Sequence, residues 1–487
     1  MNQNEMANTI AELVFIPAPG VGHIMSTVEV AKLLVNRDQR LSITVLIIKP
    51  FKSGSHSAMT TFIETLATKT TNRISFIELP QDEIGPPHDP NSRMKFFTDY
   101  ISSHCKHVRN VVADMINQPG SGRVAGFVVD MFCTSMIDVA NEFNVPTYVF
   151  FTSGAAYLAV KFYIQTFCDD LKKDFFELNR SDTEISVPSF VKPMPTKVLP
   201  PVFQFKEGLD FVLSSARDLK KVKAIMVNTY FELETYAIES FSSDISVPPV
   251  YPVGPILSLK GDSESHDDDI IKWLDTQPPS SVVFLCFGSM GSFNETQVKE
   301  IAHGLEQSGR RFLWSLRRPP SDETSKVPGD YEDPGVVLPE GFLERTDEIG
   351  KVIGWAPQVA VLAHSAVGGF VTHCGWNSLL ESLWFGVPTA AWPMYAEQQV
   401  NAFQMVLELG LAVEIKLDYK KDLFDIDGNV VVTADEIESG IRRLMTDSEM
   451  RTKVKAMSDK SRLAVAEGGS SYASVGCLIQ DFIRNIS

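Results

Sequence analysis

The sequence predicts an α/β protein with two doubly wound domains, each built on a parallel β-sheet. Short apolar runs recur along the chain, and each is followed by a turn and a segment with helical spacing. These runs are rich in Val, Ile and Phe, as is typical of strands covered on both faces. The whole series starts again after a polar segment, and 487 residues exceed the usual size of one domain.

The first half alternates strands with helices in the βαβ manner. Between the first two strands, residues 26–37 place Val28, Ala31, Leu34 and Val35 at helical spacing. The predicted strands are 12–20, 43–49, 74–80, 124–130, 145–153 and 223–230. We therefore expect a first doubly wound domain over residues 1–246.

The second half repeats the pattern over residues 270–465. A helix is expected at 295–309, and Thr433 with Glu436 predicts a capping box at the start of another helix. The predicted strands are 281–289, 311–317, 351–357, 368–373 and 388–394. Residues 247–269, rich first in Pro and then in Ser and Asp, have the composition of an interdomain linker.

Composition excludes several classes of function. A net charge of −17 argues against a nucleic-acid or anionic-membrane surface, since either needs clustered Lys and Arg. No run approaches the roughly 18–20 apolar residues of a membrane span, and the N-terminus lacks the features of a signal peptide. The six cysteines form no CxxC pair, which predicts reduced core residues in a cytoplasmic protein and no structural zinc.

Polar residues just after predicted strands are the first candidates for a functional site. The default ligand site of two doubly wound domains is the crevice faced by the carboxyl ends of both sheets. The residues in these positions are His23, Asp130, Thr152, Ser289 and His373.

The stretch 368–386, GGFVTHCGWNSLLESLWFG, predicts a strand, a tight turn and a helix. Gly375 would allow close backbone approach, and free N–H groups at a helix N-terminus bind phosphate. His373, Asn377 and Ser378 would add side-chain donors. The alternative from the residues alone is a core histidine and an Asn377 that caps the helix.

His23 and Asp130 are a candidate pair for acid–base chemistry. His23 follows PAPGVG, where two glycines would let the backbone turn sharply, and Asp130 ends the strand VAGFVVD. Histidine is a suitable general base near neutral pH, and a carboxylate on its other ring nitrogen would fix the tautomer. The alternative is a structural histidine and an unrelated strand-end aspartate.

Residues 355–398 closely resemble the signature box of plant family-1 UDP-glycosyltransferases. WAPQ opens the box, HCGWNS lies in its middle, and ES, GVP and EQ follow. PGVGH, VVD and FGSMGS also lie where this family has them. The resemblance implies the GT-B fold, with two facing Rossmann-like domains and the active site in the crevice between them. It also implies that the last helix, within 466–487, packs back on the N-terminal domain.

The resemblance assigns the nucleoside of a UDP-sugar to four residues. Trp355 should stack on the uracil ring, and Ala356 should also contact the donor. Gln358 is expected near the ribose, and Glu381 should accept the ribose hydroxyls.

The same resemblance assigns the diphosphate to the turn and to the FGSMGS loop. The expected ligands are His373, Asn377, Ser378 and Ser289, with Ser292 as a further candidate. Growing negative charge on the departing diphosphate would be stabilised there, and such a site needs no metal.

The sugar is expected to contact Glu397 and Gln398, with Trp376 beside them through its backbone and Thr152 as a further donor contact. Trp376 and Gln398 resemble the glucose-preferring members of the family, so we expect UDP-glucose as co-substrate. His23 would take a proton from the acceptor hydroxyl, and one direct displacement would invert the sugar to a β-glycoside.

The acceptor pocket should come from the N-terminal half, from residues 17–23, 84–97 and 186–206, with Gly22, His23, Phe132 and Phe205 as contacts. Its aromatic and Met content favours a small lipophilic hydroxyl compound such as a phenol, flavonoid or terpenoid. No macromolecular partner is expected, and the protein is expected to be a monomer.

Other functions fit the sequence less well. A hydrolase would need a G-x-S-x-G elbow, but Phe287 occupies the first position in FGSMG, and PAPGVGHIMST is not the G-x-G-x-x-G of a dehydrogenase. A non-catalytic binding protein would be expected to lack His23 or Asp130. An epimerase, or an enzyme using another UDP-sugar, stays open. The acidic run 267–269 indicates solvated charge rather than a metal site.

Overall fold

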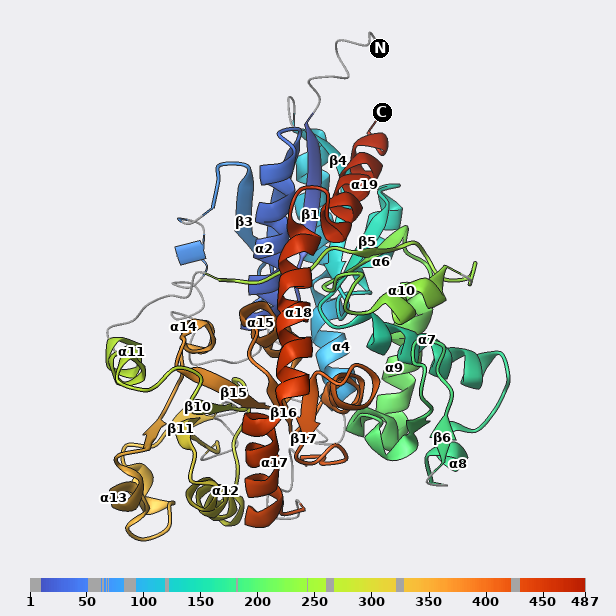
Figure 1. The fold of residues 1–487 in the computed structure, drawn as a ribbon. Helices are drawn as coiled ribbons and strands as arrows, with labels where there is room; N and C mark the ends of the chain where they lie inside the picture. Colours follow the sequence, from blue (N-terminus) through green and yellow to red (C-terminus); the bar gives the residue numbers. More distant parts are fainter. Residues whose placement is uncertain are drawn as a thin grey trace. The chain divides into compact units, whose positions relative to one another are not determined.

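The computed structural model of the chain describes residues 10–50, 63, 65, 66, 68, 70–82, 93–118, 122–180, 183–242, 244–259, 267–320, 328–421 and 430–486. Compact packing divides the chain into two units (Figure 1). Unit 1 comprises Met1–Phe175, Phe205–Ser258 and Leu463–Ser487, and unit 2 comprises Phe176–Gln204 and Leu259–Arg462. The segment 176–204, placed in the N-terminal half by the sequence analysis, thus groups with the second unit.

Unit 1 contains a seven-stranded sheet in the order β3-β2-β1-β4-β5-β8-β9, and every neighbouring pair is parallel. Its central strands are buried on both faces, which explains their nearly continuous apolar sequences. The strands are β1 (Ala11–Ile16), β2 (Leu41–Ile47), β3 (Ile74–Glu78), β4 (Arg123–Asp130), β5 (Thr147–Phe151), β8 (Ala224–Val227) and β9 (Val250–Pro252).

The helices of unit 1 are α2 (Val21–Arg37), α4 (Arg93–Ser103), α5 (Cys105–Asn117), α6 (Met136–Glu142), α7 (Ala155–Asp169), α9 (Lys206–Leu219), α10 (Thr235–Phe241) and α19 (Ser470–Arg484). The C-terminal α19 packs against β4 and β9. Phe482 is fully buried there and meets Tyr148 edge to face at 4.6 Å, while the Tyr148 hydroxyl donates to Asp481 at 2.6 Å.

Two features of unit 1 differ from the sequence-based expectation. The segment interpreted as a linker contains β9, which pairs with β8, and Pro252 is accommodated because β9 is an edge strand. The helix expected from residue 26 already begins at Val21. His23 and Gly22 therefore lie in a first helical turn, and the backbone at Gly20 is extended, with φ −162°, rather than sharply turned.

Unit 2 contains a six-stranded parallel sheet in the order β14-β11-β10-β15-β16-β17. Its strands are β10 (Val282–Cys286), β11 (Arg311–Ser315), β14 (Gly350–Ile353), β15 (Val367–Thr372), β16 (Thr389–Ala391) and β17 (Ala412–Glu414). Two small antiparallel pairs join β6 (Glu184–Ile185) to β7 (Met194–Pro195) and β12 (Arg317–Arg318) to β13 (Gly329–Asp330).

The α-helices of unit 2 are α11 (Asp267–Asp275), α12 (Glu295–Ser308), α13 (Phe342–Thr346), α14 (Gln358–Ala363), α15 (Trp376–Phe385), α16 (Gln398–Phe403) and α17 (Ala434–Thr446). α8 (Phe175–Arg180) and α18 (Ser448–Val465) run from one unit into the other along the sequence. Short helical turns are η2 (Thr196–Val198), η3 (Pro201–Gln204), η4 (Pro334–Val336) and the π-helical η5 (Gln404–Glu408).

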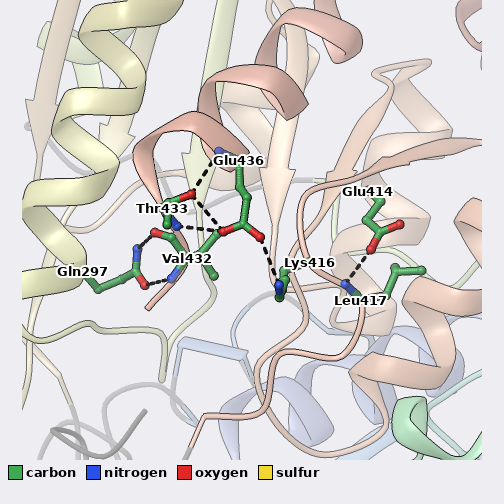
Figure 2. A network of polar contacts seen from close by, with 7 residues as sticks. All are labelled: Gln297, Glu414, Lys416, Leu417, Val432, Thr433 and Glu436. Atoms are coloured by element: carbon green, nitrogen blue, oxygen red, sulfur yellow. Dashed lines mark hydrogen bonds and ion pairs between the residues drawn. The ribbon is translucent and has the colours of Figure 1, made fainter. Parts of the chain in front are cut away.

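A polar network fixes the start of α17 (Figure 2). The Gln297 side chain on α12 exchanges two hydrogen bonds of 2.8 Å with the backbone of Val432. Thr433 and Glu436 form the capping box that the sequence predicted, and Lys416 lies 3.0 Å from the Glu436 carboxylate. These contacts hold α17 against α12 on one side of the sheet.

The strand orders explain which residues lie at the point of each sheet where a ligand can bind. In unit 1 the order reverses between β1 and β4, and in unit 2 it reverses between β10 and β15. In open parallel sheets, connections diverge at such a switch point and leave room for a ligand at the carboxyl ends of the strands. His23 and Asp130 lie at this point in unit 1, and Ser289 and His373 lie at it in unit 2.

Candidate active site

In unit 1, His23 and Asp130 form a close pair. The Nδ1 atom of His23 lies 2.7 Å from Oδ2 of Asp130. The Asp130 side chain is fully buried, whereas that of His23 is 30% exposed. Because a carboxylate accepts and does not donate, His23 holds its proton on Nδ1 and carries its basic lone pair on Nε2. The two residues are therefore partners in one contact, not an unrelated histidine and strand-end aspartate.

The loop after β4 fixes the aspartate and shields the histidine. The backbone N–H of Phe132 donates to the second oxygen of Asp130 at 3.0 Å, so both carboxylate oxygens have partners. The Phe132 ring lies beside the His23 ring, with centroids 5.4 Å apart. Thr152, at the end of β5, lies 3.3 Å from His23 Nδ1, so this predicted donor contact belongs to the same cluster.

A hollow of about 750 Å³ in unit 1 is lined in part by Phe132, the residue whose ring packs on His23. It is lined by α4, the loop after β4, and α9, and Phe132 forms part of its wall. Phe97 and Phe211 pack on the Phe132 ring at 5.6 and 6.2 Å. The hollow thus combines aromatic surface with charged groups from α4 and α9.

The other predicted acceptor residues are Gly22 and Phe205. Gly22 is exposed beside His23 in the first turn of α2. Phe205 is 43% exposed at the N-cap of α9, immediately before the helix that lines the hollow, but is not itself one of the residues that line it. Of the predicted pocket segment 84–97, residues 84–92 lie outside the described residues.

In unit 2, the turn after β15 is built around His373. This side chain is 7% exposed, and burial lowers its pKa to about 4, so the imidazole is neutral at physiological pH. A side chain on either neighbouring glycine would collide with it, because a Cβ on Gly288 or Gly375 would lie 2.6 or 2.5 Å from His373 Nε2. Gly288 also has a φ of +74°, which strongly favours glycine.

The helix α15 begins at a glycine. Gly375 occupies the N-cap position and has no side chain to cap the helix, and Asn377 lies within the first turn rather than at the N-cap position. The Trp376 side chain is buried, which leaves its backbone to meet a ligand. Ser289 is exposed on the loop after β10, next to Gly288, which packs on His373. This arrangement of helix N-terminus and small polar groups suits an anion.

Ser292 does not fit the predicted role of phosphate ligand. It is buried, and the Nζ atom of Lys421 lies 2.5 Å from its carbonyl oxygen and 3.1 Å from its hydroxyl oxygen. Ser292 thus anchors the loop that carries Ser289 instead of facing a ligand. Lys421 was not identified from the sequence, since a lysine in a polar stretch gives no sign of being buried.

Gln358, Ser378 and Glu381 form a compact polar cluster. The Nε2 atom of Gln358, at the start of α14, donates to Ser378 at 2.9 Å and to Glu381 at 2.7 Å. Ser378 and Glu381 share one face of α15 because they are three residues apart. Burial raises the pKa of Glu381 to about 7, although the Gln358 hydrogen bond lowers it.

Trp355 precedes this cluster and is 59% exposed, which is unusual for such a large apolar side chain. The Arg317 guanidinium lies over its ring, 5.0 Å from the centroid. Ala356, by contrast, is buried in the core formed by β10 and β15. Its contact with a ligand is therefore limited to the backbone. Arg317 was not selected from the sequence, although it is the last residue of the predicted strand 311–317.

Glu397 and Gln398 lie at the start of α16, near the turn that holds His373. Gln398 is buried, and its Oε1 accepts the backbone N–H groups of Met394 and Tyr395 at 2.9 Å each. Its amide is thereby oriented, so Gln398 would meet a ligand as a donor through Nε2. The Tyr395 ring lies 6.5 Å from that of His373. Glu397 is the N-cap residue of α16.

In the part of the chain that the structure describes, no three His, Cys, Asp or Glu residues are grouped so as to hold a metal ion. No helix among the same residues combines the length and the apolar character needed to cross a membrane.

Comparisons with known proteins find many similar chains. The model of the family "UDP-glucoronosyl and UDP-glucosyl transferase" matches residues 213–425. The UDP-glucose flavonoid 3-O-glucosyltransferase 6 of Fragaria ananassa is 54% identical, over 96% of this chain and 97% of its own length. UDP-glycosyltransferase 71E1 of Stevia rebaudiana is 53% identical, over 96% of this chain and 98% of its own.

Solved structures are similar over the same extent. A UGT transferase from Siraitia grosvenorii in complex with UDP has 48% identity and a TM-score of 0.87, covering 97% of this chain and 100% of that one. Medicago truncatula UGT71G1 complexed with UDP-glucose has 42% identity and a TM-score of 0.84, covering 97% and 98% of the two chains.

Proposed function

The chain belongs to the plant UDP-glycosyltransferases, enzymes of the GT-B fold with two Rossmann-like domains, and we propose that it transfers glucose from UDP-glucose to a hydroxyl group of a small lipophilic acceptor. The product would be a β-O-glucoside. The observation that carries this proposal is the 2.7 Å contact between His23 Nδ1 and Asp130 Oδ2, because it gives the chain an oriented general base.

His23 is the proposed base. Its Nε2 takes the proton of the acceptor hydroxyl as the oxygen forms a bond to C1 of glucose, while the bond from C1 to the UDP oxygen breaks. One displacement inverts the α-linked donor to a β-glucoside. Asp130 stabilises the imidazolium that forms, and its burial keeps the pair in one geometry.

The donor would be held by unit 2. In this proposal Trp355 stacks on uracil, and Gln358 and Glu381 bind the ribose. Ser289 and the first turn of α15 would bind the diphosphate, joined by a neutral His373. The helix N-terminus stabilises charge on the departing UDP, so the proposed reaction proceeds without a metal ion.

Glucose is the proposed sugar, with Glu397, Gln398 and the Trp376 backbone as its contacts. Support comes from the oriented Nε2 donor of Gln398 and from the glucosyltransferase named among the relatives. The proposed acceptors are phenols, flavonoids or terpenoids, which match the aromatic surface around Phe132 and the size of the adjoining hollow.

The test is a UDP-release assay with UDP-glucose and a panel of phenolic acceptors in the presence of EDTA, followed by mass detection of one added hexosyl unit. Acceptor-dependent UDP release with a glucoside product is expected. His23→Ala should lower kcat by about 10²-fold or more while UDP binding stays close to wild type. Asp130→Asn is the matched change, expected to reduce kcat through the wrong tautomer. Equal loss of UDP binding and turnover in His23→Ala would overturn the proposed base.

A further inference from the structure

Among the described residues of unit 2, the most exposed aromatic side chain lies against a cation. Trp355 is 59% exposed, yet the Arg317 guanidinium sits over its ring at 5.0 Å from the centroid. A guanidinium at this distance is attracted by the negative face of the indole. The Arg317 guanidinium thereby occupies one face of the Trp355 ring. This contact holds the ring in place although much of the side chain is exposed to solvent.

Arg317 is itself rigidly held. Its Nε lies 2.8 Å from the Asp330 carboxylate and 3.2 Å from the carbonyl oxygen of Gly329, and its Nη2 donates to the carbonyl of Pro328 at 2.6 Å. Only 10% of the Arg317 side chain is exposed, in contrast to 51% of Asp330. Two nitrogens of the planar fork, Nε and Nη2, thus contact β13 and the residue before it, which orients the guanidinium.

The backbone just before Trp355 is fixed by Ser315 and by Asp330. The Ser315 hydroxyl donates to the carbonyl of Gly354 at 2.7 Å. The Asp330 carboxyl packs on Gly354 so closely that a Cβ there would lie 2.5 Å from its Cγ atom. Asp330 therefore contacts both Arg317 and the residue preceding Trp355, and it links the position of the guanidinium to that of the indole.

We propose that Arg317, held by Asp330, is a positioning residue that fixes Trp355 as the platform on which the donor's nucleotide base stacks. This inference rests on the proposed function, in which Trp355 stacks on uracil. The cation covers one face of the indole and restricts its rotation, so the ring is already oriented when the base arrives. Binding then requires less ordering of the side chain.

The experiment measures the Kd of UDP and the KM and kcat for UDP-glucose in Arg317→Met, Trp355→Ala and the double variant. Arg317→Met is expected to raise the Kd and KM by about threefold to tenfold, with kcat changed less than about twofold. In the Trp355→Ala background, Arg317→Met should raise the Kd and KM little further, because the indole ring that it positions has already been removed. If Arg317 only stabilised β12 and β13, Arg317→Met should instead weaken UDP binding by the same factor with or without Trp355.

The chain offers a matched control. Arg462 lies over the Trp384 ring at 4.6 Å and donates to the Trp384 carbonyl at 2.9 Å, at the far end of α15 from Trp376. Arg462→Met removes the same kind of contact and should leave the Kd of UDP unchanged. If Arg317→Met does not fold, Asp330→Asn replaces it, with an expected rise in Kd of about twofold to threefold.

The outcomes separate this inference from the proposed function. If Trp355→Ala weakens UDP binding but Arg317→Met and Asp330→Asn do not, the positioning role is wrong and the stacking role stands. If Trp355→Ala leaves UDP binding unchanged, the stacking role fails and the inference fails with it. An equal effect of Arg462→Met would also overturn the inference, because the loss would then not be specific to Trp355.

Discussion

Protonation of Glu381 should control donor binding near neutral pH. Burial raises the pKa of this carboxyl to about 7 from an ordinary value of 4.5, while Gln358 donates to it at 2.7 Å. Ribose hydroxyls donate best to the ionised carboxylate. Binding of UDP-glucose should therefore favour the ionised form, lower the pKa of Glu381 and release protons on association.

The size of the effect follows from that pKa. If only the ionised form binds well, affinity falls about tenfold for each pH unit below 7, and about thirtyfold between pH 8 and pH 5.5. His373, with a pKa of about 4, and Tyr395, with a pKa of about 12, titrate outside this window. UDP-glucose suits the measurement better than UDP because it lacks a terminal phosphate that titrates near pH 6.

Isothermal titration calorimetry from pH 5.5 to 8.5 at constant ionic strength would measure this dependence. Titrations at pH 7 in two buffers of different ionisation enthalpy should show release of about half a proton. Glu381→Gln should bind about tenfold more weakly at pH 8, with little dependence on pH. A constant affinity in the wild type over this range, or the same slope in Glu381→Gln, would refute the reasoning.

Two further predictions concern the support of the loop after β10, which is proposed to bind the diphosphate. Burial lowers the pKa of Lys421 to about 8 from 10.5, so the unfolded chain binds more protons between these values and the free energy of unfolding should rise from pH 8 to pH 10.5. Thermal melts across this range should show the rise in wild type but not in Lys421→Met, and its persistence there would assign it to another group. Gly288→Ala forces a positive φ on alanine and a contact with His373, so it should destabilise the protein by about 1–3 kcal/mol and weaken UDP binding. Unchanged melting and UDP affinity would show that the loop shifts freely.

Much of the fold follows from local sequence patterns. The apolar runs locate β1, β4, β10 and β15 to within a few residues, because a strand buried on both faces needs nearly continuous apolar sequence. The capping box at Thr433 is local chemistry over four residues, and the structure confirms it. β9 was missed because the prolines in and around it suggest a linker, although an edge strand tolerates proline.

The candidate site was predictable in part for the same reason. Residue type and position after a strand selected His23, Asp130 and His373, and the resemblance of residues 355–398 to a known box selected most of the others. The burial of Ser292 against Lys421 and the contact of Arg317 with Trp355 were not predictable. Both contacts depend on which distant segments pack together, and neither is marked by a periodic or compositional pattern in the sequence.

By itself, the sequence determined the class of fold, the position of the central strands and the kinds of chemical groups available, because these depend on periodicity and residue type over short distances. Tertiary structure decided which groups meet. The order of strands sets β1 beside β4, and this brings together His23 and Asp130, which are 107 residues apart. It also sets β10 beside β15, so that Gly288 packs on His373. Parallel pairing between distant strands is selected by packing of the whole sheet, and that information is spread over the entire domain.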